Sequence, residues 1–123
     1  TGEFRAVGSD AVKRSNVRVI CATNADLRRK MALREFRDDL YYRIARFVLR
    51  VPPLLERRED IPALSAQFLA ENAPGKLLSP AAAALLGTFP WQGNVRQLHS
   101  CLWNAAMLAG ASPVILPAHI EYF

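Results

Sequence analysis

The two parts of the chain differ in how their hydrophobic residues are grouped. Up to Asp60, short apolar runs alternate with charged residues, whereas the residues after it are rich in Ala and Leu. The β-branched run Val17–Ala22 and the run Phe47–Val51, which two prolines stop, are typical of buried strands in a parallel sheet. Charged, helix-forming sequence, Ala25–Ile44, lies between them. The order predicts a strand–helix–strand unit.

Three helices are predicted after Asp60. The first has apolar residues near helical spacing, namely Ile61, Leu64, Phe68 and Leu69. The second begins at Ser79-Pro80, a typical N-cap and first helical residue, and ends near Gly87. The third begins around Asn94 and stops near Gly110. We therefore expect an α/β chain with two subdomains, residues 1–60 with strands and helices and residues 61–123 as a small helical bundle.

The net charge of +5 belongs entirely to the first of these subdomains. Residues 1–60 hold 14 Lys and Arg against 9 Asp and Glu, whereas residues 61–123 hold 2 of each sign. The basic residues are mostly interleaved with acidic ones, which weakens the case for a stripe that binds a nucleic-acid backbone. A solvated face of mixed charge and a direct nucleic-acid interface both remain open.

Composition and the absence of targeting signals in the sequence indicate the class of protein and its compartment. A hydrophobic content of 51% in 123 residues is ample for a packed core. The first residue is Thr1, and neither a signal peptide nor an apolar run of the roughly 20 residues that cross a membrane is found. We expect a cytoplasmic segment of a longer protein that does not associate with a membrane. Cys21 and Cys101 lie far apart in the sequence and outside any Cys/His cluster. We therefore expect both to be small core residues, and we expect no metal site.

Residues Arg34–Arg43 contain the first candidates for chemistry. On a helical wheel at about 100° per residue, an apolar stripe about 80° wide is flanked by Arg37 and Arg43. The stripe consists of Phe36, Leu40 and Ile44. This pattern suits a helix whose guanidinium groups project towards the phosphates of a partner, because their forked donors match phosphate oxygens. Pairing with the aspartates that follow Arg37 is the simpler alternative.

Two further candidates are polar residues beside predicted elements. Thr23 and Asn24 follow a predicted strand, where ligands of open α/β sheets bind and where an amide could orient a water. Either residue, or Asp26, could instead cap the next helix. Arg96 lies in the first turn of the last predicted helix. A cation there opposes the helix dipole, which hints at an external anion, although a long side chain can also bend into solvent.

Taken together, the motifs resemble one family, the AAA+ ATPase domain of bacterial sigma-54-dependent transcriptional activators, also called enhancer-binding proteins. The matching segments cover most of the chain. They are GEFRAVGS at 2–9, VRVICATNADL at 17–27, FRDDLYYRI at 36–44, PPLLERREDIP at 52–62, LSPAA at 78–82 and FPWQGNVRQL at 89–98. The resemblance implies the C-terminal half of that domain, the end of the αβ core followed by an all-α helical-bundle lid.

The resemblance also implies roles for individual residues. Thr23 and Asn24 match sensor I, which monitors the γ-phosphate, and Arg37 and Arg43 match arginine fingers that act in trans on the ATP of the adjacent subunit. Arg96 matches the sensor II arginine. Val95 would lie near the base or ribose of the nucleotide. The stretch that links core to lid would line the adenine side around Ile61. Arg34 matches none of these roles.

The same resemblance implies cofactors and partners for a longer parent protein. They are ATP with Mg²⁺, other copies in a ring that is expected to be a hexamer, RNA polymerase bound to sigma-54, and enhancer DNA. The chain itself contains no GxxxxGK[ST] P-loop, no Asp-Glu pair after an apolar strand, no GAFTGA loop and no helix-turn-helix. The isolated chain is therefore expected to be inactive and to bind no nucleotide tightly.

Some positions depart from the family pattern. Leu55 stands where arginine is usual, Cys21 where alanine is usual, and Gln97 and His99 where glutamates are usual. Losing the glutamate at 97 removes a possible partner for Arg96 or for a neighbouring backbone donor, which puts the geometry of the lid in question. Two readings of function follow. The chain is either part of an ATP-driven activator of transcription or a truncated, non-catalytic module for regulation or oligomerisation.

Overall fold

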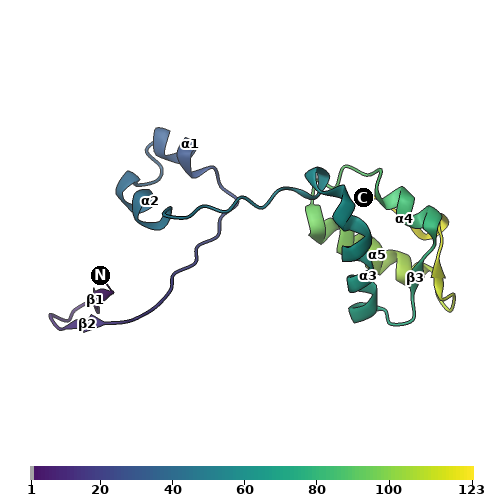
Figure 1. Cartoon of the computed structure of the whole chain (residues 1–123), viewed down its shortest axis with the longest axis horizontal. Coiled ribbons are helices and arrows are strands. Elements are labelled where there is room, and N and C mark those ends of the chain that lie inside the picture. The colour runs from purple at the N-terminus through teal and green to yellow at the C-terminus, as the bar shows by residue number, and fades with distance from the viewer. Residues whose placement is uncertain (1) are drawn as a thin grey trace. The chain divides into compact units, whose positions relative to one another are not determined.

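The computed structural model describes residues 2–123, which form two compact units. The first ends at Leu49, and the second is Arg50–Phe123 (Figure 1). Each unit has its own elements and is described by itself. Among the described residues, no helix is both long and apolar enough to span a membrane.

The first unit contains a hairpin and two short helices. Strands β1 (Glu3–Arg5) and β2 (Val12–Arg14) pair in antiparallel fashion, with Phe4 opposite Lys13. Helices α1 (Leu27–Ala32) and α2 (Asp38–Ile44) follow. The single helical stretch expected between residues 25 and 44 is therefore divided. Arg34 lies in the division with a φ of 59°, a left-handed conformation that ends a right-handed helix.

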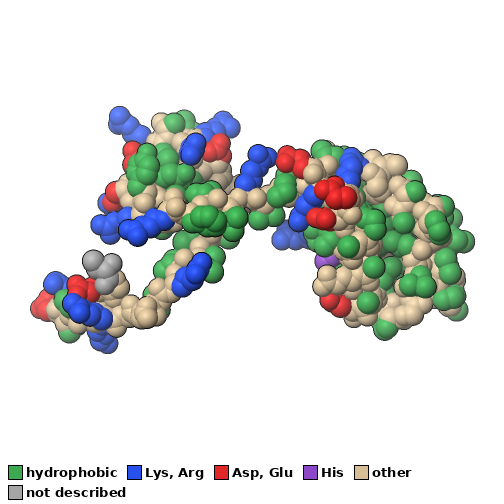
Figure 2. Space-filling model, viewed as in Figure 1, with side chains coloured by type: hydrophobic (Ala, Val, Ile, Leu, Met, Phe, Trp, Pro, Cys, Tyr) green, Lys and Arg blue, Asp and Glu red, His purple; other side chains and the backbone are tan. Residues whose placement is uncertain are grey.

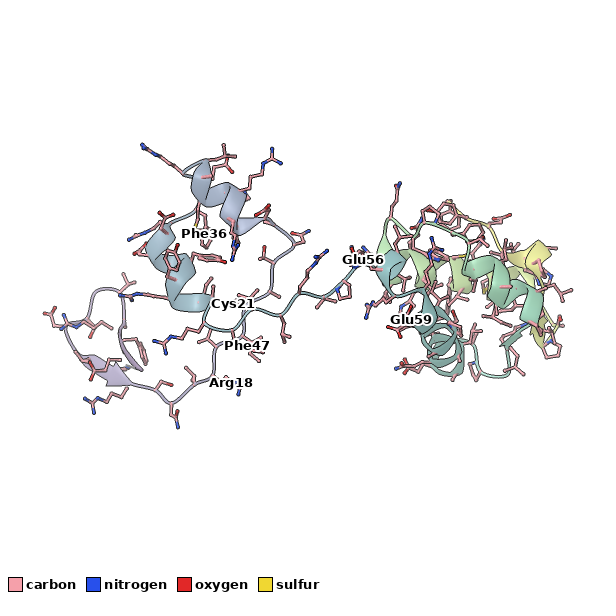
Figure 3. The ribbon with its side chains drawn as sticks, turned by 45° about the horizontal axis from the view of Figure 1, so that its top comes forward. Arg18, Cys21, Phe36, Phe47, Glu56 and Glu59 are labelled. Carbon is pink, nitrogen blue, oxygen red and sulfur yellow. The ribbon has the colours of Figure 1, made fainter. Side chains whose placement is uncertain are left out.

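The two strands predicted from the apolar runs are wrong. Residues 17–22 and 47–51 form no ladder within residues 2–123, and their side chains are exposed, with Ile20 at 84% and Phe47 at 81%. Figure 3 shows Cys21 and Phe47 on irregular chain rather than in a sheet. The physical reason is that a parallel strand needs a neighbouring strand for its hydrogen bonds. The described residues offer none to these runs, and the hairpin was not predicted.

The second unit is a helical bundle with a small parallel ladder. Its elements in chain order are the 3-10 turns η1 (Leu54–Glu56) and η2 (Arg58–Asp60), α3 (Ile61–Asn72), β3 (Leu77–Leu78), α4 (Pro80–Leu86), α5 (Asn94–Leu108), β4 (Val114–Ile115) and η3 (Pro117–His119). Strands β3 and β4 pair in parallel, with Leu77 opposite Val114. Helices α3 and α5 pack against each other in Figure 1.

The three helices of this unit match those predicted from the sequence. Ser79 caps α4 as expected, because its Oγ accepts a hydrogen bond from the Ala82 amide at 3.1 Å. Leu54 is fully buried in the core of the unit, together with Ile61 and Leu98. Since Leu54 precedes the predicted boundary at 60, the compact unit begins earlier than that boundary, at Arg50.

Candidate functional site

Helix α2 carries the two candidate arginines at its opposite ends. The helix begins at Asp38, and Arg37 is its N-cap residue with an extended backbone, φ −75° and ψ 131°. Phe36 and Arg37 therefore lie before the helix, and the predicted wheel does not apply to them. Figure 3 shows Phe36 between α1 and α2. The apolar stripe is also less buried than expected, because Leu40 is 43% exposed.

Arg37 forms a two-pronged ion pair with Asp39. Its Nε donates to Oδ1 at 3.0 Å and its Nη2 donates to Oδ2 at 2.8 Å. The hydrogen bond from Arg37 lowers the pKa of the Asp39 carboxyl below its usual value, and the same bond raises the pKa of Arg37. The two side chains are 80% and 61% exposed, so water and salt screen this pair.

Arg43 lies in the last turn of α2 and is exposed. Within residues 2–123 its guanidinium makes no ion pair and no side-chain hydrogen bond. Within the described residues its five N–H donors are therefore unpaired, whereas two of the donors of Arg37 are occupied. Of the two arginines, Arg43 is the one that can bind an incoming anion without first breaking a contact.

The Thr23-Asn24 pair lies just before α1, on exposed chain. The Thr23 hydroxyl accepts a hydrogen bond from the Ala25 amide at 3.0 Å, which forms a local turn. Asp26 is the residue that caps α1, because its Oδ1 accepts from the Arg29 amide at 3.0 Å. Capping by Asp26 leaves the Asn24 amide without a capping role, and no hydrogen bond of that side chain is found among the described residues.

In the second unit, Arg96 lies in the first turn of α5 and is exposed. The part of the chain that the structure describes provides no carboxylate partner for it. Val95 beside it is half-buried and packs against the core. Ile61 is only 1% exposed, so lid side chains occupy its surface in this arrangement. The roles expected for Val95 and Ile61 stay predictions.

The start of α5 also contains contacts that the sequence did not predict. The Leu54 amide donates to Oδ1 of Asn94 at 2.8 Å, and Asn94 has a left-handed φ of 53°. Gln97 Oε1 accepts from the Gly93 amide at 3.0 Å. A Cβ on Gly93 would come within 2.8 Å of the Gln97 Cβ, so a glycine is required there. The residue that replaces the expected glutamate thus still satisfies a backbone donor.

Charge is concentrated in the first unit, as Figure 2 shows by the many Lys and Arg side chains with acidic ones between them. An open depression of about 290 Å³ borders the start of α2 and is lined by Arg34, Glu35, Arg37 and neighbouring residues. Its rim carries charges of both signs, which agrees with the mixed-charge interpretation. Within residues 2–123 no group of three or more His, Cys, Asp or Glu side chains could hold a metal ion.

Family models match the chain in two segments. Residues 55–122 match the AAA+ ATPase lid domain, and residues 1–50 match the sigma-54 interaction domain. The chain therefore belongs to the AAA+ ATPase family, in the branch of the sigma-54 activators. The resemblance inferred from the sequence motifs is confirmed.

Several curated proteins contain a similar segment. The anaerobic nitric oxide reductase transcription regulator NorR of Serratia proteamaculans is 43% identical over 129 residues, covering 96% of this chain and 25% of that protein. The DNA-binding transcriptional regulator NtrC of Salmonella typhimurium is 41% identical, covering 99% and 27%. A limonene hydroxylase of Geobacillus stearothermophilus is 43% identical, covering 93% and 22%. The chain thus spans about a fifth to a third of its curated relatives.

Among solved structures, NtrX of Brucella abortus has the same fold. The structure in complex with ATP superimposes with a TM-score of 0.80 at 32% identity, covering 98% of this chain and 30% of NtrX. The ADP complex gives the same TM-score. The predicted fold class, the C-terminal part of an AAA+ domain with its lid, is confirmed by this likeness.

Proposed function

We propose that this chain supplies the arginine fingers and sensor residues of an ATP-hydrolysing AAA+ domain whose P-loop lies in the rest of a longer protein. The observation that carries the proposal is the unpaired, exposed Arg43 on α2. It lies in a chain of which 98% superimposes on the ATP complex of NtrX. A cation with all its donors free, at the end of a short exposed helix, is suited to reach a phosphate on another subunit.

Arg43 is assigned as the principal finger and Arg37 as the second. Hydrolysis of a phosphoanhydride requires positioning of water and stabilisation of the charge that develops on the transferred phosphoryl group. A guanidinium supplied by the next subunit contributes that charge. Arg37 must exchange its two bonds to Asp39 for bonds to phosphate oxygens, whereas Arg43 has none to exchange. We therefore expect loss of Arg43 to be the more damaging.

The remaining candidate residues act within their own subunit. The side chain of Asn24, next to Thr23, orients the attacking water and reports on the γ-phosphate. Arg96 contacts the phosphates from the lid, and Val95 lies beside the base or ribose. The stretch around Ile61, which links core to lid, lines the adenine side. Mg²⁺ would accompany ATP, and no residue of this chain is assigned to hold it.

The partners proposed for the complete protein follow from the same family. They are further copies in a ring, with six as the expected number, RNA polymerase bound to sigma-54, and enhancer DNA, all in the cytoplasm. The segment shared with limonene hydroxylase is the same one shared with NorR and NtrC, so that name is not transferred to this chain. Supplying a finger in trans makes each turnover depend on assembly of the ring.

The test uses the complete protein, meaning the full product of the gene that encodes this chain. Its ATP turnover is compared with that of Arg43→Ala, Arg37→Ala and the control Arg29→Ala, which removes an exposed arginine on α1. We expect Arg43→Ala to lose about 10³- to 10⁵-fold in turnover at saturating ATP. Turnover near that of the wild type, with ring assembly intact, overturns the proposal. So does a coding sequence without a P-loop, which favours the non-catalytic module.

A further inference from the structure

The last residues of the chain dock onto the start of α5. We call Ile120–Phe123 the C-terminal strap. Ile120 packs against the core of the second unit. The Tyr122 ring stacks on Phe89, with centroids 4.7 Å apart and planes 23° apart, and meets Trp91 edge-on at 5.6 Å. Glu121 adds a hydrogen bond from Asn104 at 3.0 Å. The strap is therefore held by side chains from the loop before α5 and from α5 itself.

Gln97 joins the strap to the first turn of α5. Its Oε1 accepts from the Gly93 amide at 3.0 Å, and its Nε2 donates to the Phe123 carbonyl oxygen at 2.7 Å. The bridge needs a group that accepts at one end and donates at the other. An amide does both, whereas an ionised carboxylate only accepts. Glutamine is therefore the residue type that this bridge requires.

The turn held by Gln97 also contains Arg96 and Asn94. Arg96 lies between the two ends of the Gly93–Gln97 hydrogen bond. Asn94 accepts the hydrogen bond from the Leu54 amide, which ties the same turn to η1. One helical turn of α5 thus contacts η1 through Asn94 and the C-terminal strap through Gln97, and it also carries the exposed Arg96.

We propose that Gln97 is a positioning residue, through which docking of the C-terminal strap sets the direction of Arg96. This inference rests on the proposed function only for the role of Arg96 towards nucleotide. The docked strap holds the first turn of α5 in one geometry, and its release lets that turn vary. Nucleotide affinity is then sensitive to whatever lies beyond Phe123 in the complete protein.

The bridge itself is tested with Gln97→Glu on this chain carrying an amidated C-terminus, so that Phe123 keeps a neutral carbonyl group as it does inside a longer protein. The variant keeps an acceptor for the Gly93 amide and loses the donor to Phe123. Gln92→Glu is the matched control, because Gln92 is exposed in the loop just before α5 and undergoes the same change of charge. By NMR, we expect a roughly 3- to 10-fold fall in the ratio of docked to free strap, seen as weaker Phe89–Tyr122 ring contacts and shifted Arg96 resonances. A spectrum like that of Gln92→Glu overturns the proposal.

The effect on Arg96 is tested on the complete protein. Gln97→Glu is expected to raise KM for ATP roughly 3- to 10-fold while kcat stays within about twofold. In an Arg96→Ala background the same substitution is expected to change KM no further, since the two residues act through one contact. An equal change in both backgrounds shows a merely structural role and overturns the proposal. If the wild type hydrolyses no ATP, the proposed function fails, and the NMR comparison still decides the bridge.

Discussion

Asn94 fastens the start of α5 to η1, and its replacement is expected to destabilise the second unit by a predictable amount. Its Oδ1 accepts the hydrogen bond from the Leu54 amide, and Leu54 is fully buried. Asn94→Ala leaves that N–H without a partner, at a cost of about 1–3 kcal/mol. Alanine also tolerates the left-handed φ of 53° poorly, which adds about 1 kcal/mol. The sum predicts a loss of roughly 2–4 kcal/mol in the free energy of unfolding.

Two companion variants separate these terms. Asn94→Gly loses the hydrogen bond but adopts the left-handed conformation freely, so it should be about 1 kcal/mol more stable than Asn94→Ala. Asn94→Asp keeps the acceptor and places an acidic group at a helix N-terminus, so it should remain within about 1 kcal/mol of wild type.

Urea unfolding followed by tryptophan fluorescence is the assay. Both tryptophans of the chain, Trp91 and Trp103, lie in the second unit, so the signal reports on that unit. The reasoning is refuted if Asn94→Ala unfolds at the same urea concentration as the wild type with an unchanged m-value. It is also refuted if Asn94→Asp is as unstable as Asn94→Ala, since the side-chain oxygen that accepts from the Leu54 amide would then contribute nothing to stability.

Two further predictions concern thiols and protons. Cys21 is exposed, whereas Cys101 is buried, and burial raises the pKa of the Cys101 thiol. A thiol reagent at pH 8 should therefore modify Cys21 at once and Cys101 only as the bundle opens. Equal rates of modification at the two cysteines would contradict the structure. The pKa of Asp39 is lowered by Arg37, so the stabilisation from this pair is present above the unfolded-state pKa of the carboxyl and is lost as pH falls through the lower folded value. A carboxyl NMR titration should show the depressed midpoint returning to the usual range in Arg37→Ala, and an unchanged midpoint would assign the shift to another cause.

The helical bundle could be predicted well because its signals are local. The Ser79-Pro80 start of α4 and the start of α5 at Asn94 depend on neighbouring residues only, and both appear in the structure. The resemblance to the family also predicted that these helices together form a lid, because the sequence motifs occur in the same order as in that family. Leu54 was missed as a core residue, since its burial depends on α5, which lies far along the chain.

The first unit was harder to predict because its regular structure depends on distant partners. An apolar run such as Val17–Ala22 becomes a strand only beside another strand, and residues 2–123 place none next to it. The left-handed Arg34 was also not signalled, because arginine rarely adopts that conformation. The Arg37–Asp39 pair was foreseen as an alternative, but the freedom of Arg43 required coordinates.

The bridge through Gln97 shows what spacing cannot reveal. The sequence marked position 97 only as a departure from a glutamate, which suggested a lost partner. In the structure the glutamine has a partner that a glutamate could not have, because the Gln97 side-chain amide donates to the carbonyl oxygen of Phe123, 26 residues further along the chain. Contacts between residues so far apart leave no periodic pattern in the sequence from which they could be predicted.

The central claim is that Arg43 acts on the nucleotide of a neighbouring subunit, and mixing two defective forms of the complete protein tests it most directly. One form carries Arg43→Ala, and the other has its P-loop lysine replaced. Each alone should hydrolyse ATP at a small fraction of the wild-type rate. Mixed rings should recover turnover, because a lysine-replaced subunit offers its intact Arg43 to the intact site of its neighbour. Absence of recovery in rings shown to contain both forms would contradict action in trans.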